Sequence, residues 1–92
     1  MAERILYVYA EPREENPSEN TNVVETVEGG KVIRREVGLI DGVIGLRVLE
    51  AWVQNYYDIR FDRSPDGKAP SIQLDTGLLS KLYSNMPTLT IQ

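Results

Sequence analysis

The first apolar run of the chain, residues 4–10, predicts a β-strand. Its sequence is RILYVYA, which is rich in the β-branched and aromatic side chains that strands favour. Alternation divides these side chains between two faces, with Leu6 and Val8 on one and Ile5, Tyr7 and Tyr9 on the other. Because both faces are largely apolar, we expect the strand to be buried on both sides or to lie at the centre of a sheet.

Residues 11–22 interrupt this apolar pattern with the sequence EPREENPSENTN. The segment contains two prolines and four glutamates but no aliphatic or aromatic residue. Such a composition buries too little apolar surface to offset the entropy of an ordered chain. We therefore predict a mobile acidic loop over residues 11–22.

The sequence VVETVEGGKVIRREV, residues 23–37, predicts a β-hairpin. Gly29 and Gly30 supply the positive φ angles that two-residue hairpin turns require. The register that follows contains three cross-strand pairs: Val27 with Val32, Glu28 with Lys31, and Glu25 with Arg34. Alternation then sends Arg34 and Arg35 to opposite faces. Because apolar and charged residues mix on both faces, we expect a half-buried hairpin that projects from the sheet and offers a contact surface.

Apolar residues after the hairpin recur at the spacing of an α-helix. One row repeats every four residues and a second row lies beside it: Ile40, Ile44, Val48, Trp52 and Tyr56, then Leu46, Leu49, Val53 and Tyr57. Polar residues fill the remaining side, which is the pattern of an amphipathic helix. We predict a helix over residues 43–57, with Asp41 as its N-cap. The competing interpretation is a second hairpin, because Asp41-Gly42 between apolar residues is a strong turn signal.

The last third of the chain predicts shorter elements. We expect a strand at 58–62, a Pro-Asp-Gly turn at 64–68 and an edge strand at 71–74. A short helix at 75–85 and a terminal strand at 88–91 follow. The sequence thus predicts a single α+β domain over residues 1–92. It contains a small mixed sheet with a β-hairpin, one long amphipathic helix and one short helix.

From residue 23 onward, this order of elements resembles the β-grasp architecture of ubiquitin-like domains. The resemblance rests on the hairpin, the long helix and the strands that follow, and it includes no signature residues. Conjugating ubiquitin-like proteins end in Gly-Gly, whereas this sequence ends in Ile91-Gln92, so the resemblance implies no conjugation. It implies a fold and leaves the function open.

Composition removes several kinds of chemistry. The chain contains neither cysteine nor histidine, so thiolate nucleophiles, zinc–thiolate sites and histidine-based dyads are excluded. The formal net charge of −4 opposes non-specific binding to a phosphate backbone. No apolar run approaches the roughly 20 residues that span a bilayer, and the N-terminus lacks the pattern of a signal peptide. These features favour a small acidic protein of the cytoplasm.

Residues 62–73, DRSPDGKAPSIQ, match part of a calcium-binding loop. Oxygen-bearing side chains stand at the alternate positions that such a loop uses, namely Asp62, Ser64 and Asp66. Gln73 stands where the loop requires a bidentate glutamate, and two prolines stiffen the segment. A Pro-Asp-Gly turn explains the same residues without a metal. We therefore assign no metal ligand and no cofactor, and we keep calcium as an alternative.

Weaker signals point to a nucleotide, a nucleic acid or an enzyme. Gly30-Lys31 ends like a phosphate-binding loop, but the first glycine and the final hydroxyl of that motif are missing. Aromatic residues of the first strand, with the arginine pair at 34–35, have the chemistry that holds single-stranded nucleic acid. Carboxylates and the lysine of residues 58–68 form the only cluster that we would nominate for catalysis. We expect none of these to be the main function.

A protein-binding surface is the leading interpretation. The residues that we assign to it are aromatic or basic: Tyr56, Tyr57, Arg60, Arg34 and Arg35. Aromatic residues and arginine anchor many protein interfaces. We expect Trp52 in the core, and Tyr57 and Arg60 exposed at the edge of the helix. The sequence therefore favours a non-enzymatic inhibitor, adaptor or subunit that binds a protein, and exposed strand edges leave a homodimer open.

Overall fold

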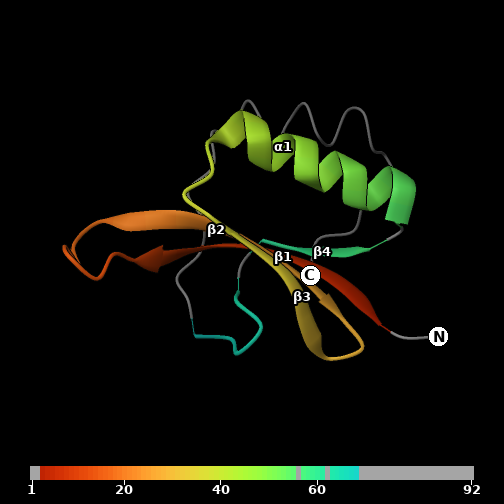
Figure 1. The fold of residues 1–92 in the computed structure, drawn as a ribbon, viewed down its shortest axis with the longest axis horizontal. Helices are drawn as coiled ribbons and strands as arrows, with labels where there is room; N and C mark the ends of the chain where they lie inside the picture. The colour runs from red at the N-terminus through yellow and green to blue at the C-terminus, as the bar shows by residue number, and fades with distance from the viewer. Residues whose placement is uncertain (1–2, 56, 62, 69–92) are drawn as a thin grey trace.

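The computed structural model describes residues 3–55, 57–61 and 63–68. Four strands form one mixed sheet in the order β3-β2-β1-β4 (Figure 1). The strands are β1 Arg4–Pro12, β2 Asn20–Glu28, β3 Lys31–Val37 and β4 Asp58–Arg60. β1 pairs antiparallel with β2 and parallel with β4, and β2 pairs antiparallel with β3. With the helix α1, Asp41–Glu50, on one face of the sheet, this arrangement confirms the α+β class.

The first strand lies inside the sheet, as its two apolar faces predict. β1 has β2 on one side and β4 on the other, and residues 5–10 are all buried. Leu6 and Val8 pack on the side of α1. The opposite face carries a second buried cluster that joins β1 to β2, namely Ile5, Tyr7, Tyr9, Val23 and Val27.

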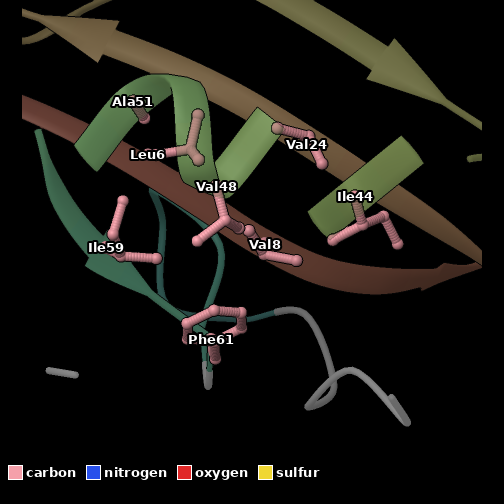
Figure 2. Close-up of a cluster of buried hydrophobic side chains, with 8 residues drawn as sticks. All are labelled: Leu6, Val8, Val24, Ile44, Val48, Ala51, Ile59 and Phe61. Carbon is pink, nitrogen blue, oxygen red and sulfur yellow. The ribbon is translucent and has the colours of Figure 1, made fainter. Parts of the chain in front are cut away.

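The main core lies between the sheet and α1 (Figure 2). It consists of buried side chains from both layers: Leu6, Val8, Val24, Ile44, Val48, Ala51, Ile59 and Phe61. Complete burial of an Ile or Val side chain contributes about 1.5–3 kcal/mol, so a three-residue strand such as β4 is anchored largely by Ile59, which is fully buried. Trp52 is partly buried against this core, as expected.

The hairpin forms at the predicted turn, but its register differs from the prediction. Gly29 and Gly30 have φ angles of 59° and 80°, which lie in the left-handed region that glycine adopts without strain. The register shifts between Thr26 and Val27, so that Glu25 faces Arg35. The predicted pair of Glu25 with Arg34 is therefore wrong, because a β-bulge inserts one extra residue into β3. The hairpin also does not project as a unit, since among the described strands β2 is interior and β3 lies at the edge.

The connection between β1 and β2 is shorter than the predicted loop. β1 continues to Pro12 and β2 begins at Asn20, with Glu11 opposite Thr21. Only residues 13–19 connect the two strands. The polar composition of residues 11–22 predicted a segment without backbone pairing. Its two ends instead pair with each other and extend β1 and β2, because paired backbone groups satisfy their hydrogen bonds.

The helix predicted over residues 43–57 forms in place of the competing hairpin, but it begins two residues earlier than predicted. The N-cap is Ile40, whose backbone is extended, and Asp41 is the first helical residue. Asp41 is therefore not the cap, although an acidic side chain in the first turn complements the helix dipole. The helix continues beyond α1 as a π-helical segment, Ala51–Asn55. Asn55 is its last described residue, and the predicted end at residue 57 is not helical.

The described chain ends with the predicted turn. In residues 64–68, the Gly67 N–H donates to the Ser64 carbonyl oxygen at 2.9 Å, and Gly67 has a φ of 74°. The predicted strand 71–74, helix 75–85 and strand 88–91 lie outside the described residues. In the part of the chain that is described, no helix is long and apolar enough to cross a membrane.

Candidate functional site

The tyrosine and arginine near residue 60 do not form one surface. Tyr57 is partly buried and packs against the core below α1. Arg60 lies on the opposite face of the sheet, where its guanidinium carbon is 5.7 Å from the centre of the Tyr7 ring. Side chains alternate along β4, so residues 57 and 60 face opposite ways. Tyr56, the third member of the group, lies outside the described residues.

Arg60 takes part in contacts within the fold. One guanidinium nitrogen donates to the Tyr7 hydroxyl at 3.4 Å, and the other lies 3.6 Å from a Glu3 carboxylate oxygen. Its side chain is only 22% exposed. The predicted exposure of Arg60 is therefore wrong, because β4 turns this side chain onto the β1 face that carries Tyr7.

Arg34 and Arg35 point to opposite faces of β3, as alternation predicts. Arg35 donates to both carboxylate oxygens of Glu11 at 2.6 Å, and its Nε donates to Glu25 at 2.9 Å. Glu25 is buried and also accepts a hydrogen bond of 2.7 Å from the Tyr9 hydroxyl. The Glu11 contact raises the pKa of Arg35, and burial together with the Glu25 contact raises the pKa of Tyr9. Arg35 therefore joins three strands of the sheet.

Arg34 belongs to a charged cluster on the helix side of β3. Its Nε lies 3.1 Å from Glu36, and its side chain is 53% exposed. Glu36 also accepts two hydrogen bonds from Arg47 of α1, at 2.7 and 3.1 Å. The Arg47 contact holds the pKa of Glu36 below its ordinary value. This cluster fixes the edge strand to the helix.

A hollow lies between α1 and β3 at this cluster. Residues from the sheet, the helix and the segment before β4 line it: Leu6, Thr26, Ile33, Arg34, Glu36, Arg47, Glu50, Ala51 and Tyr57. The structure thus brings Arg34 and Tyr57, two of the residues assigned from sequence, to one hollow. Arg35 and Arg60 are not part of it.

The outer face of α1 and of the π-helical segment that follows it carries a row of exposed apolar residues. Leu46, Leu49 and Val53 are 61%, 40% and 49% exposed. Together with Arg47 and Glu50 they line a second hollow. Arg47 and Glu50 border both hollows, so the two adjoin. We call Leu46, Leu49, Val53, Ile33 and Arg34 the helix–edge surface.

The sequence contained the signal for this exposed row. At about 100° per residue, positions 46, 49 and 53 lie on the side of the helix opposite positions 44, 48 and 51. The pattern of apolar residues alone predicts that the first set forms a row beside the buried one. The structure corrects this assignment, because Ile44, Val48 and Ala51 face the sheet and the other three face away.

The residues of the predicted calcium loop that are described form a turn. The Ser64 hydroxyl donates to Asp66. The Lys68 N–H lies 3.2 Å from the Ser64 hydroxyl oxygen and 3.1 Å from Asp66 Oδ1. The bond from Ser64 lowers the pKa of Asp66. Among residues 3–55, 57–61 and 63–68, no three acidic side chains gather as a metal site would require; Asp62 and residues 69–73 lie outside this range.

The chain was compared with known protein families, curated proteins and solved structures. No protein family, no curated protein and no solved structure matches the chain.

Proposed function

We propose that this protein is a non-enzymatic binding domain that recognises another protein through the helix–edge surface. It would act as an inhibitor, an adaptor or a subunit of a larger complex. The observation that carries the proposal is the exposed row of Leu46, Leu49 and Val53 on a helix whose opposite side is already buried in the core. Contiguous apolar side chains on a small domain commonly mark a binding site.

The surroundings of this row support the same function. Ile33, which is 56% exposed, and Arg34 lie across the adjoining hollow. Interfaces combine an apolar centre with arginine and a polar rim. The helix–edge surface has this composition, whereas Arg35 and Arg60 are engaged in contacts within the sheet.

The proposal is tested by placing charges on the row. In the double variant Leu49→Asp/Val53→Asp, both substitutions lie on the exposed side, so the fold should tolerate them. We expect the variant to lose a partner that the unchanged protein captures from source cells, as measured by quantitative mass spectrometry. The midpoint of urea unfolding should stay close to that of the unchanged protein.

Ile40→Asp is the matched control. Ile40 is also an exposed apolar residue, at 71%, but it is the N-cap of α1 and not part of the helix–edge surface. Aspartate is a favourable N-cap, so this variant should fold and keep the partner. Capture of the same proteins by all three versions would refute the proposed surface.

A further inference from the structure

The outer edge of β3 presents backbone groups that no described strand pairs. β3 is the last strand on its side of the described sheet, and most of its residues are exposed. The Gly38 N–H donates to the Asn22 carbonyl oxygen at 2.8 Å, so the backbone of residue 38 faces β2. These groups alternate in direction along an antiparallel pair. Because the pairing is regular from residue 35 to residue 37, the N–H and C=O groups of Arg35 and Val37 point toward the open edge.

Side chains on both faces of the sheet hold this part of the edge in its extended form. On one face, Arg35 is bound to Glu11 and Glu25. On the other, Glu36 accepts two hydrogen bonds from Arg47 of α1. A strand that is already ordered loses little conformational freedom when it binds. Outward backbone groups spaced by two residues are the groups with which a peptide strand pairs when it adds to a sheet.

At the end of this edge lies a hollow that carries negative charge. It is lined by Val37, residues 11–15 and Thr21; we call it the acidic hollow. Within it, Arg13 is paired with Glu19. Glu14 and Glu15 are exposed, and among the described residues they form no ion pair. An extended chain that passes Val37 therefore meets two carboxylates that attract a cation.

From these features we propose that β3 adds an extended segment of another protein as an antiparallel strand, and that this segment carries basic side chains at its N-terminal end. Its backbone pairs with Arg35 and Val37. Because the two strands run in opposite directions, the N-terminal end of the segment lies beyond Val37, where Lys or Arg side chains meet Glu14 and Glu15. Antiparallel pairs are slightly more stable per residue than parallel ones. The inference goes beyond the proposed function, because a strand edge and the acidic hollow carry it.

A second copy of β3 fits this edge less well. The antiparallel register that pairs both Arg35 and Val37 with the same two residues of the copy sets Glu36 opposite Glu36. Like charges directly across a ladder destabilise it. In that register the copy places Arg35 opposite Val37, but this arginine is already bound to Glu11 and Glu25. A segment of another protein has neither disadvantage.

The test measures the binding of synthetic peptides to the whole chain by fluorescence anisotropy. The probe has about eight alternating threonine and valine residues, a usual strand length, preceded by a pair of lysines. One control carries the lysines at its C-terminal end, and another carries glutamates in place of the lysines. We expect the probe to bind about two- to fivefold more tightly than the first control, the range for exposed ion pairs. The glutamate peptide should bind most weakly. Equal affinity of the three peptides, or no binding of the probe, overturns the inference.

Backbone methylation separates strand pairing from attraction between charges alone. A version of the probe with methyl groups on all its central nitrogens keeps both lysines but donates no backbone hydrogen bond from either edge. We expect its affinity to be lower by about tenfold or more, because several hydrogen bonds are lost. Binding that survives methylation would show that the lysines act without strand pairing, and the inference would fail.

A substitution at Val37 tests the same pairing from the side of the protein. Val37→Pro removes the outward N–H of β3, and proline is tolerated on an edge strand where the N–H faces away from the ladder. Val37→Thr keeps the N–H and the β-branched side chain, so it is the matched control. The proline variant should lose the probe and the threonine variant should keep it, with urea unfolding as the check that both fold. Equal binding by both contradicts the inference, and the methylated probe decides if the proline variant does not fold.

Neutral variants test the acidic hollow. Glu14→Gln/Glu15→Gln should abolish the preference for N-terminal lysines. Glu3→Gln/Glu28→Gln changes the net charge equally at the opposite end of the β1–β2 ladder, so it should leave the preference intact. Loss of the preference in both would indicate a general charge effect and overturn the assignment.

The variant that tests the proposed function separates the two sites. Leu49→Asp/Val53→Asp alters the outer side of the helix and leaves the edge of β3 unchanged, so it should bind the probe as the unchanged protein does. Loss of the probe in this variant would place the peptide on the helix–edge surface and overturn the inference. Loss of a cellular partner with the probe retained supports two separate surfaces.

Discussion

At the scale of single residues, the face of the helix decides what a side chain contributes. Ile40 and Ile44 are four residues apart and belong to the same predicted row. Ile44 is fully buried in the core, whereas Ile40, which precedes the first helical residue with an extended backbone, is 71% exposed. The same isoleucine side chain therefore contributes far more to the stability of the fold at position 44 than at position 40.

This difference gives the first prediction. Ile44→Ala should lower the free energy of unfolding by about 2–5 kcal/mol, because it removes buried methyl groups and leaves a cavity. Ile40→Ala should change it by less than about 0.5 kcal/mol, as expected for an exposed site. Urea unfolding of both variants measures the two values. A similar loss for both would show that residue 40 packs in solution.

Glu36 provides a prediction about pH. Its pKa is lowered by the Arg47 contact, so its charged form stabilises the fold above the ordinary pKa of a glutamate. That contribution is lost as the pH falls through the lower pKa of the folded state. Glu36→Gln should therefore be less stable than the unchanged protein near neutral pH, and the difference should shrink in acid. The measurement is the free energy of unfolding of both proteins over this pH range, with Glu14→Gln as an exposed control. A difference between Glu36→Gln and the unchanged protein that does not vary with pH would contradict the prediction.

At the scale of elements, the hairpin shows what a local pattern determines. The turn was predictable because Gly29-Gly30 is a local signal. The register was not, because the bulge after Val32 has no marker in the sequence, and one extra residue moves Glu25 from Arg34 to Arg35. The same limit applies to the arginines of the candidate site. Alternation predicted that Arg34 and Arg35 face opposite ways, but the residues that each one contacts depend on the bulge.

The turn yields its own prediction. Gly30 has a φ of 80°, and a Cβ added there would meet no atom within 4 Å. Gly30→Ala should therefore lower stability by about 1–2 kcal/mol through backbone strain alone. Gly29→Asn should be close to neutral, because Asn-Gly is a preferred pair in such turns. Thermal or urea unfolding measures the stability of both variants. An equal loss of stability in the two would mean that the turn adopts another conformation.

The helix and the connection before β2 show how tertiary context changes a local prediction. Periodicity identified the helix over most of its length, but it could not tell which of two apolar rows faced the sheet. Residues 11–12 and 20–22 looked like loop by composition, yet they pair as strands. Their pairing is supported by the contact of Glu11 with Arg35, a residue 24 positions away. Interactions at such separations cannot be read from a local window.

At the scale of the whole molecule, the edges of the sheet govern self-association. In the described part of the chain, β3 and β4 are the edge strands, and β4 has only three residues. β3 has seven residues and exposes Val32, Ile33 and Val37. A long edge with exposed apolar residues can pair with another chain. Its charges and its bulge are the features that oppose such pairing.

Pairing β3 with its own copy brings like charges together. An antiparallel pairing about the middle of the strand sets Arg34 opposite Arg34. Slipping by one residue sets Arg34 opposite Arg35, and slipping by two sets Arg35 opposite Arg35. Like charges directly across a ladder destabilise it, and the bulge further disturbs the edge.

We therefore predict that the chain is a monomer at micromolar concentrations. Sedimentation equilibrium should return the mass of one chain, 10.4 kDa, with no dependence on concentration. A dimer would contradict the prediction, and two variants would then locate its interface. Dissociation by Val32→Lys alone would identify pairing at β3, because Val32 is exposed on the edge strand and is not part of the helix–edge surface. Dissociation by Leu49→Asp alone would identify the outer face of α1, which would then be occupied by a second copy.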